Sequence, residues 1–284
     1  MMRLRIEAEL DYQFAQPTSV LLAIEVAPQD DQRIVVDRLT VDGSGPLTPV
    51  AGECGVGRRT WTTAEGRLLA RYAATVDVDR PDPDFARLRT VAPAQVPAEF
   101  VQFLWPSRYC QSDRLCAFVG RKFKALRGGA AVAEMARWIG AEIGYVRGSS
   151  DTTTTAVDTF VKRQGICRDY AHLMVSFARA ADIPARAVAA YAPGVTPPDF
   201  HAVAEVWLTD GTTASWHLVD ATGMTRASEI ARIAVGRDAT DISFMTSFGN
   251  ARLNAQKVLV ETVPHSGTAA ASPSLTGKHQ EQVS

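Results

Sequence analysis

The 284-residue sequence is poor in the features that mark secreted, membrane and metal-binding proteins. It has only four cysteines, with no Cys-x-x-Cys pair and no zinc-type spacing to its five histidines. It also lacks a run of about 18 uncharged apolar residues of the kind that spans a membrane. We therefore expect no metal site and no membrane partner. We expect free thiols, with a disulfide between Cys110 and Cys116 as the less favoured alternative. The four cysteines are Cys54, Cys110, Cys116 and Cys167.

Charge and binding motifs exclude further classes of function. The 30 basic and 31 acidic residues nearly cancel, so the composition offers no electrostatic reason to propose a nucleic acid as partner. The sequence contains no phosphate-binding loop and no dinucleotide fingerprint, and we expect no cofactor. Residues 1–7 lack the continuous apolar segment of a secretory signal, which favours a cytoplasmic location.

The N-terminal third of the chain alternates between apolar and polar residues, as half-buried antiparallel strands do. The alternation is strictest over residues 4–14. Further β-rich runs, separated by clusters of Gly, Pro, Asp and Ser, follow at 20–26, 32–41, 58–62 and 68–78. Short strands at this spacing predict an N-terminal antiparallel β-sandwich domain over residues 1–90.

Beyond a proline-containing linker at 91–97, the pattern changes to helical periodicity. It predicts helices over 113–126, 130–143 and 155–164, the last with Gly165 as its C-cap. A final strand is predicted at 253–263, and the polar composition of 264–284 predicts a disordered tail. We expect an α+β protein whose second domain, residues 91–263, packs helices on an antiparallel sheet.

The most informative stretch of the second domain starts at Gly165 and continues as an apolar-periodic run that ends before Pro184. The period puts Cys167 in the first turn of a buried helix, where unpaired N–H groups and the helix dipole favour a thiolate over a thiol. The alternative is that Cys167 is simply a small buried residue. His172 lies on another face of this helix, and we predict a hydrogen-bonded structural histidine there rather than a catalytic base.

A hairpin is predicted around Asp210-Gly211, because this pair is the preferred centre of a two-residue turn. With such a turn the numbers of paired residues add up to 421, so that His201 lies directly opposite Asp220. The carboxylate then accepts the imidazole N–H and fixes its orientation. A longer loop that extends to Thr213 would shift this pairing. The same register puts His217 on the opposite face from His201, which argues against a metal shared by the two.

A helix-borne thiol, an imidazole and a carboxylate that orients it are the groups of a thiol acyl-transfer site. In this hypothesis Cys167 attacks an amide or ester carbonyl, His201 serves as base and then acid, and Asp220 holds the imidazole. The tetrahedral intermediate also needs donors for its oxyanion. Tyr145 and Trp105 are candidates for this role beside the N–H of Cys167, with simple packing as the alternative for both.

At these positions the sequence resembles the bacterial transglutaminase-like superfamily. The resemblance covers most of residues 100–260 and implies a papain-like core with Cys167, His201 and Asp220 as the catalytic triad. Members commonly have a glutamine or similar residue after the cysteine and a phenylalanine before the Ala-His pair, where this chain has Arg168 and Tyr170. The β-rich N-terminal part is more loosely similar to the domain that precedes many bacterial members. The matching segments are 165–172 (Gly-Ile-Cys-Arg-Asp-Tyr-Ala-His), 183–186 (Ile-Pro-Ala-Arg), 199–202 (Asp-Phe-His-Ala) and 219–222 (Val-Asp-Ala-Thr).

Three charged residues lie near the predicted triad, and two of them, Arg168 and Glu205, have two interpretations each. Arg168 is either a solvated side chain or a contact that holds the thiolate or an acidic substrate group. Asp169 is accounted for by the helix dipole alone. Glu205 shares the face of His201 and is either solvated or a support of the imidazole.

The function predicted from these residues is a thiol-dependent acyl-transfer enzyme that acts on peptide or amide bonds of a peptide or protein substrate. Water is the favoured acceptor, which would make the protein a cysteine peptidase or amidase. One alternative is a protein-glutamine transglutaminase with an amine acceptor, and another is a non-catalytic peptide-binding module. A thiol redox protein is less favoured, because no resolving cysteine lies near Cys167 in the sequence. The substrate and the oligomeric state stay open.

Overall fold

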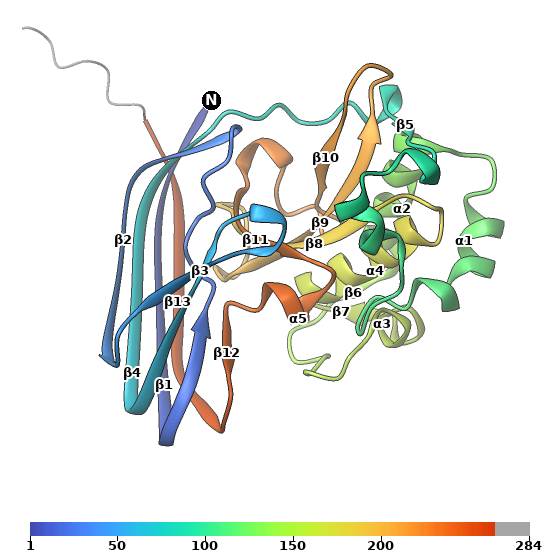
Figure 1. Ribbon diagram of the computed structural model, residues 1–284. Helices are drawn as coiled ribbons and strands as arrows, with labels where there is room; N and C mark the ends of the chain where they lie inside the picture. Colours follow the sequence, from blue (N-terminus) through green and yellow to red (C-terminus); the bar gives the residue numbers. More distant parts are fainter. Residues whose placement is uncertain (265–284) are drawn as a thin grey trace, which may run out of the picture.

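The computed structural model describes residues 1–264, which form two large antiparallel sheets and a group of helices. Figure 1 shows the six-stranded sheet on the left, the five-stranded sheet in the centre and the helices on the right. The α+β class with a β-rich N-terminal part is therefore confirmed. The strands are β1 (Met2–Leu22), β2 (Gln32–Ser44), β3 (Thr48–Ala51), β4 (Arg58–Val78), β5 (Arg89–Thr90), β6 (Gly144–Tyr145), β7 (Gln164–Gly165), β8 (Ala185–Tyr191), β9 (His201–Thr209), β10 (Ala214–Val219), β11 (Ala231–Gly236), β12 (Met245–Ser247) and β13 (Ala251–Val263). The α-helices are α1 (Cys116–Lys122), α2 (Gly128–Glu142), α3 (Ala156–Lys162), α4 (Cys167–Arg179) and α5 (Ala239–Ile242).

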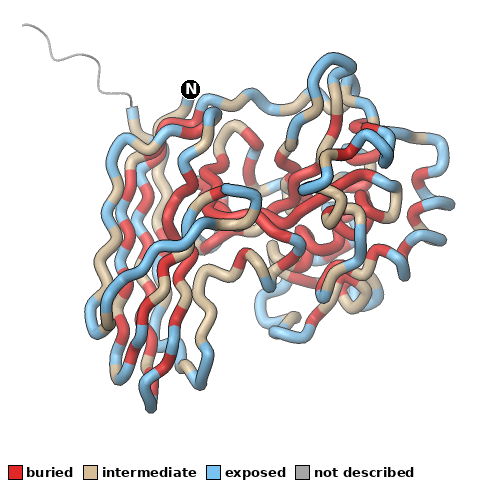
Figure 2. The backbone as a smooth tube through the Cα atoms, in the orientation of Figure 1, coloured by how far each residue is buried: buried red, intermediate tan, exposed pale blue. Residues whose placement is uncertain are grey.

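The N-terminal sheet is built on two strands, β1 and β4, of 21 residues each. The apolar positions that alternate along β1 are buried on one face, and buried and exposed residues alternate along the strands in Figure 2. The sequence predicted two shorter strands in place of each long one. The structure has an irregularity between Phe14 and Thr18 that shifts the β1–β4 register without ending it. Such a bulge bends a strand while pairing continues on both sides.

The C-terminal part of the chain completes this N-terminal sheet. β13 pairs with residues 3–14 of β1, and β12 pairs with residues 20–22 of the same strand. The predicted last strand at 253–263 therefore exists. It belongs to the N-terminal sheet, however, and not to the predicted second domain, residues 91–263. Pairing between β1 and β13 crosses the boundary predicted near residue 90.

The buried face of the six-stranded sheet packs against β8, β11 and α5. The β-sandwich predicted for residues 1–90 is therefore wrong, because the N-terminal strands β1 to β4 form one sheet and not two. Tyr72 of β4 and Tyr191 of β8 stack with ring centroids 6.3 Å apart. The carboxylate of Glu205 on β9 is fully buried and is bound by Arg186 at 2.7 Å and Arg232 at 2.6 Å. The alternatives predicted for Glu205, a solvated residue or a support of His201, are therefore both wrong. A buried carboxylate needs such partners, and they come from β8 and β11.

The helices of the second part follow the predicted periodicity, with shorter bounds. The predicted helix 113–126 is reduced to α1, whereas α2 and α3 agree with the prediction within a few residues. Thr155 caps α3 by accepting the N–H of Asp158. Arg163, with φ 56°, and not Gly165, ends this helix. Gly165 instead makes room for Asp169, because a Cβ on residue 165 would lie 2.7 Å from the Cβ of Asp169.

The predicted C-terminal tail and the predicted location of the protein have separate outcomes. The tail predicted at 264–284 lies outside the described residues apart from Pro264. Within residues 1–264 no helix has the length and apolar character needed to cross a membrane. The cytoplasmic location stays a prediction.

Candidate active site

Cys167 is the first residue of α4, as its sequence pattern predicted, and its side chain is half-buried. The helix starts here because Ile166 has an extended backbone and its N–H is bound by the buried carboxylate of Asp169, with N···O 2.9 Å. Asp169 therefore does more than complement the helix dipole. The N–H of Cys167 itself belongs to the first turn, whose N–H groups have no acceptor within the helix. The thiol thus lies at the positive end of α4.

His201 and Asp220 form a buried pair next to this thiol. His201 Nε2 lies 3.0 Å from Asp220 Oδ2, and the two side chains are 0% and 2% exposed. The sulfur of Cys167 approaches the carbonyl oxygen of Phe200, the residue before His201, at 4.0 Å. Because Nε2 is bound to the carboxylate, the imidazole nitrogen left for the thiol is Nδ1. Nδ1 is buried and has no hydrogen bond of ordinary length within residues 1–264.

The contact between His201 and Asp220 exists, but the register that predicted it is wrong. Paired residues of β9 and β10 add up to 423, with Ala214 opposite Thr209 as the last pair, so the loop has four residues rather than two. The carboxylate of Asp210 accepts the N–H groups of Thr212 and Thr213 and keeps both in the loop. A shift of two residues preserves the face of every side chain.

Asp220 lies just beyond β10 and is oriented by a turn that our sequence analysis did not use. Its Oδ1 accepts the backbone N–H and the hydroxyl of Thr222, at 2.9 and 2.7 Å. Its Oδ2 accepts the N–H of Thr225 at 3.1 Å in addition to the imidazole. An Asp two residues before a Thr is a typical signal for this kind of local side-chain to backbone turn. The carboxylate is therefore held in place independently of the strand pairing.

The environment of His201 favours its charged form. Burial alone would lower the pKa of His201, but the hydrogen bond to Asp220 and the interaction with Cys167 outweigh burial and raise this pKa to about 9. Burial acts in the opposite direction on Asp220, and the bond from His201 keeps the pKa of this carboxyl below its usual value. Both directions are those of an imidazolium stabilised by a carboxylate.

The two aromatic residues proposed as oxyanion donors occupy different places. Tyr145 is held in β6, which pairs with β7 directly before α4. Burial and interaction with the thiol of Cys167 raise the pKa of Tyr145 to about 12. Trp105 is 60% exposed, and its carbonyl binds Arg179 at the other end of α4, about 18 Å from Cys167 along the helix. The structure brings Tyr145 to the thiol and does not bring Trp105 there.

Arg168 and His172 are both bonded within the protein. The guanidinium of Arg168 donates to Asp169 at 3.0 Å and to the carbonyl of Asp151 at 2.7 Å, and the side chain stays 24% exposed. A contact of Arg168 with the thiolate or with substrate stays a prediction. His172 is buried, accepts the N–H of Ala239 at 3.0 Å and stacks on Tyr109. Burial lowers the pKa of His172 to about 4, which keeps the ring neutral. The prediction of a structural histidine is confirmed.

A cleft of about 620 Å³ is lined by residues that include Cys167 and His201. One wall comes from the segments around Cys167 and His201. The other wall comes from residues 239–247 and from Gln256 of β13, which our sequence analysis did not connect with the site. β12 and β13 reach the cleft by pairing with β1, and α5 reaches it by packing against β8 and β11. No short sequence motif marks them.

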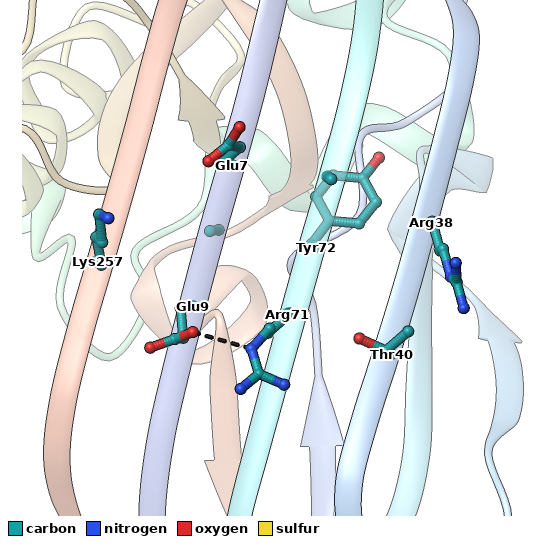
Figure 3. A pocket seen from close by; sticks show the side chains of 9 residues that line it. Glu7, Glu9, Arg38, Thr40, Arg71, Tyr72 and Lys257 are labelled. Atoms are coloured by element: carbon teal, nitrogen blue, oxygen red, sulfur yellow. Dashed lines mark hydrogen bonds and ion pairs between the residues drawn. The ribbon is translucent and has the colours of Figure 1, made fainter.

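The described residues contain no metal-binding group and no disulfide, but they form a second hollow besides this cleft. Within residues 1–264 no group of three or more His, Cys, Asp or Glu side chains could hold a metal ion. The four cysteines are free thiols. A second hollow of about 330 Å³ lies over the six-stranded sheet and is lined by charged side chains such as Glu9 and Arg71, which form an ion pair at 3.0 Å (Figure 3). It contains no nucleophilic thiol and no histidine.

Comparison with known proteins agrees with this fold. Residues 119–221 match the family model of the transglutaminase-like superfamily. A crystal structure from Cytophaga hutchinsonii, described as "a Putative Cysteine Protease", aligns with a TM-score of 0.86 and 31% identity over 94% of this chain and 92% of that one. An uncharacterized protein of Mycobacterium leprae is 24% identical over 218 residues, which are 75% of this chain and 68% of that protein. On the strength of the family model and the structure from C. hutchinsonii, this chain belongs to the transglutaminase-like superfamily.

Proposed function

We propose that the protein is a cysteine peptidase or amidase with Cys167, His201 and Asp220 as its catalytic triad. The observation that carries this proposal is the 3.0 Å contact of the buried His201 and Asp220 side chains beside a half-buried thiol at a helix N-terminus. A thiolate at that position is favoured by the helix dipole, and an imidazolium is favoured by the carboxylate. The two charged groups stabilise one another, as in an activated thiol nucleophile.

The reaction would proceed in two steps. In the first, the Cys167 thiolate adds to the carbonyl carbon, and the oxyanion accepts the N–H of Cys167 and the hydroxyl of Tyr145. The imidazolium of His201 then gives its proton from Nδ1 to the leaving amine, the carbon–nitrogen bond breaks, and an acyl-thioester remains. In the second, His201 takes a proton from water, hydroxide replaces the thiolate on the acyl carbon, and the acid is released.

Access to the thiol supports water as the acceptor. The cleft opens beside Cys167, and this side chain is half-buried rather than enclosed. A site that transfers acyl groups to amines must keep water from the thioester. The structural neighbour from Cytophaga hutchinsonii is described as a protease, which adds support for hydrolysis.

A peptide library offered together with a labelled primary amine tests this function. Wild-type protein and Cys167→Ala are incubated with both, and the products are identified by mass spectrometry. New peptide termini formed by wild type, and not by Cys167→Ala, are the expected result. Incorporation of the amine would instead indicate a transglutaminase, and unchanged peptides would indicate a binding module.

A further inference from the structure

Strand β12 is an edge strand that borders the active-site cleft. It pairs with residues 20–22 of β1, and within residues 1–264 no other strand pairs with it. Figure 1 shows β12 on the border of the six-stranded sheet that lies toward α5. All three of its residues, Met245, Thr246 and Ser247, line the same cleft as the thiol of Cys167.

The hydrogen bonds around β12 show which of its backbone groups face β1 and which face the free edge. Phe244 accepts an N–H from the β1 chain, and Phe248 donates its N–H to a β1 carbonyl, both at 2.9 Å. Alternate residues of an antiparallel strand direct their backbone groups to the same side. Thr246 therefore also faces β1, whereas Met245 and Ser247 direct their N–H and C=O groups to the free edge.

This edge has capacity for hydrogen bonds. The carbonyl of Met245 accepts the hydroxyl of Ser243 at 3.0 Å and retains a second lone pair. The N–H groups of Met245 and Ser247 and the carbonyl of Ser247 also lie on the unpaired side. Three residues of strand span about 10 Å, enough to align two or three residues of an added chain.

An apolar wall lies next to this edge. The rings of Phe200 and Phe244 are stacked with centroids 4.6 Å apart, and Met245 is partly buried beside them. Phe200 directly precedes His201, so this wall adjoins the proposed catalytic residues. An apolar side chain that enters the cleft would be covered here.

We propose that the substrate of this site is an extended peptide segment that pairs as an added strand with the free edge of β12. An apolar or aromatic side chain of that segment then packs on Phe200, Phe244 and Met245. Main-chain pairing supplies affinity, and the apolar wall supplies selectivity. The inference rests on the proposed function, since it names the substrate class for the same thiol. Because helices and inner strands already pair their backbone groups, the substrates are extended segments with unpaired backbone, such as unfolded or terminal segments.

Binding to the full-length Cys167→Ala protein tests the pairing without chemistry. The probe is a fluorescein-labelled alanine peptide with one phenylalanine, measured by fluorescence anisotropy. A series of the same peptide carries one backbone N-methyl group at each position in turn. Strand pairing uses every second N–H, so methylation should weaken binding about tenfold at alternate positions and leave the positions between them unchanged.

A second variant tests the protein side of the same bonds. Ser247→Pro in the Cys167→Ala background removes an N–H of the free edge and leaves the bonds from β12 to β1 in place. We expect about threefold to tenfold weaker binding of the alanine–phenylalanine peptide, whereas the conservative variant Ser247→Ala, which retains the N–H, should restore the affinity. An unchanged thermal unfolding midpoint shows that Ser247→Pro is folded.

The proposal is overturned if the alanine–phenylalanine peptide does not bind, if all N-methyl positions respond equally, or if folded Ser247→Pro binds it as the parent does. Its failure is distinguishable from failure of the proposed function. Alternating N-methyl sensitivity together with a wild-type protein that cleaves nothing would support strand pairing and reject the hydrolase. Cleavage of peptides without the alternating pattern would support the hydrolase and reject the pairing.

Discussion

His201 and Asp220 are 3.0 Å apart although they are not cross-strand partners. The register of β9 and β10 directs Asp220 toward Val203, two residues from His201 and on the same face of the sheet. The contact forms because Asp220 leaves the strand at a turn that aims its carboxylate at the imidazole.

Replacing the nucleophile should abolish activity and preserve the fold. Cys167→Ala removes one half-buried sulfur, so the free energy of unfolding should change by about 1 kcal/mol or less. Peptide cleavage and denaturant unfolding of the purified variant measure the two effects. Turnover retained by Cys167→Ala would reject Cys167 as the nucleophile.

Asp220→Asn should lower the pH at which activity is lost on the alkaline side. The imidazolium of wild type persists below a pKa of about 9 and is lost as the pH rises through that value. An amide in place of Asp220 stabilises the imidazolium less, so the pKa of His201 falls and the alkaline limb of kcat/KM moves to lower pH. Alkylation of Cys167 should correspondingly need higher pH, because the thiolate loses part of its counter-charge.

Glu205→Gln is the matched control for this experiment, four residues from His201 on the same strand. It should leave the pH dependence of Cys167 alkylation unchanged, because Glu205 is bound to Arg186 and Arg232 and not to the imidazole. The variant should nevertheless lose about 3–5 kcal/mol of stability, since the buried guanidinium of Arg186 loses its carboxylate and Arg232 keeps only that of Asp31. Equal shifts of the alkylation profile in both variants would mean that another residue orients His201.

Removing the hydroxyl of Tyr145 should slow catalysis. Tyr145 has a pKa raised to about 12, so it remains a hydrogen-bond donor throughout the useful pH range. Loss of one oxyanion donor lowers kcat by about 100-fold. Tyr145→Phe should therefore show a lower kcat at similar KM, while Trp105→Phe, at the far end of α4, should match wild type. A similar loss in both variants would point to packing as the cause.

His172 should make the protein sensitive to acid. Folding lowers the pKa of His172 from 6.5 to about 4, so the unfolded chain takes up the proton first as the pH falls. The free energy of unfolding should decrease between pH 6.5 and pH 4, by about 3 kcal/mol from this group. In His172→Gln this contribution is absent, and denaturant unfolding at several pH values should show a flatter curve. Parallel curves for the two proteins would contradict the assignment.

Cleavage between the two parts of the chain should not separate them. The sequence suggested that residues 1–90 form a separable unit, but β13 pairs with β1 and the core is shared with β8 and β11. A protease site engineered into the exposed segment around Pro83 should give two fragments that elute together in gel filtration. Free elution of the N-terminal fragment as a folded monomer would restore the original domain boundary.

Local patterns in the sequence were sufficient for the elements that carry the site. Alternation of apolar residues predicted β1, and helical spacing put Cys167 at the start of α4. Strand parity placed His201 and Asp220 on one face even though the loop length was wrong. These features depend on the period of a helix or strand, which neighbouring residues determine by themselves.

Only the tertiary structure decided which distant segments meet. Nothing near Glu205 in the sequence indicates Arg186 and Arg232 as its partners, and nothing near Met245 indicates that β12 borders the thiol. Such contacts depend on how buried faces pack and on which strands pair across more than 200 residues, as β1 and β13 do. The reason is that pairing energy depends on the whole set of strands available, whereas periodicity is a property of each segment alone.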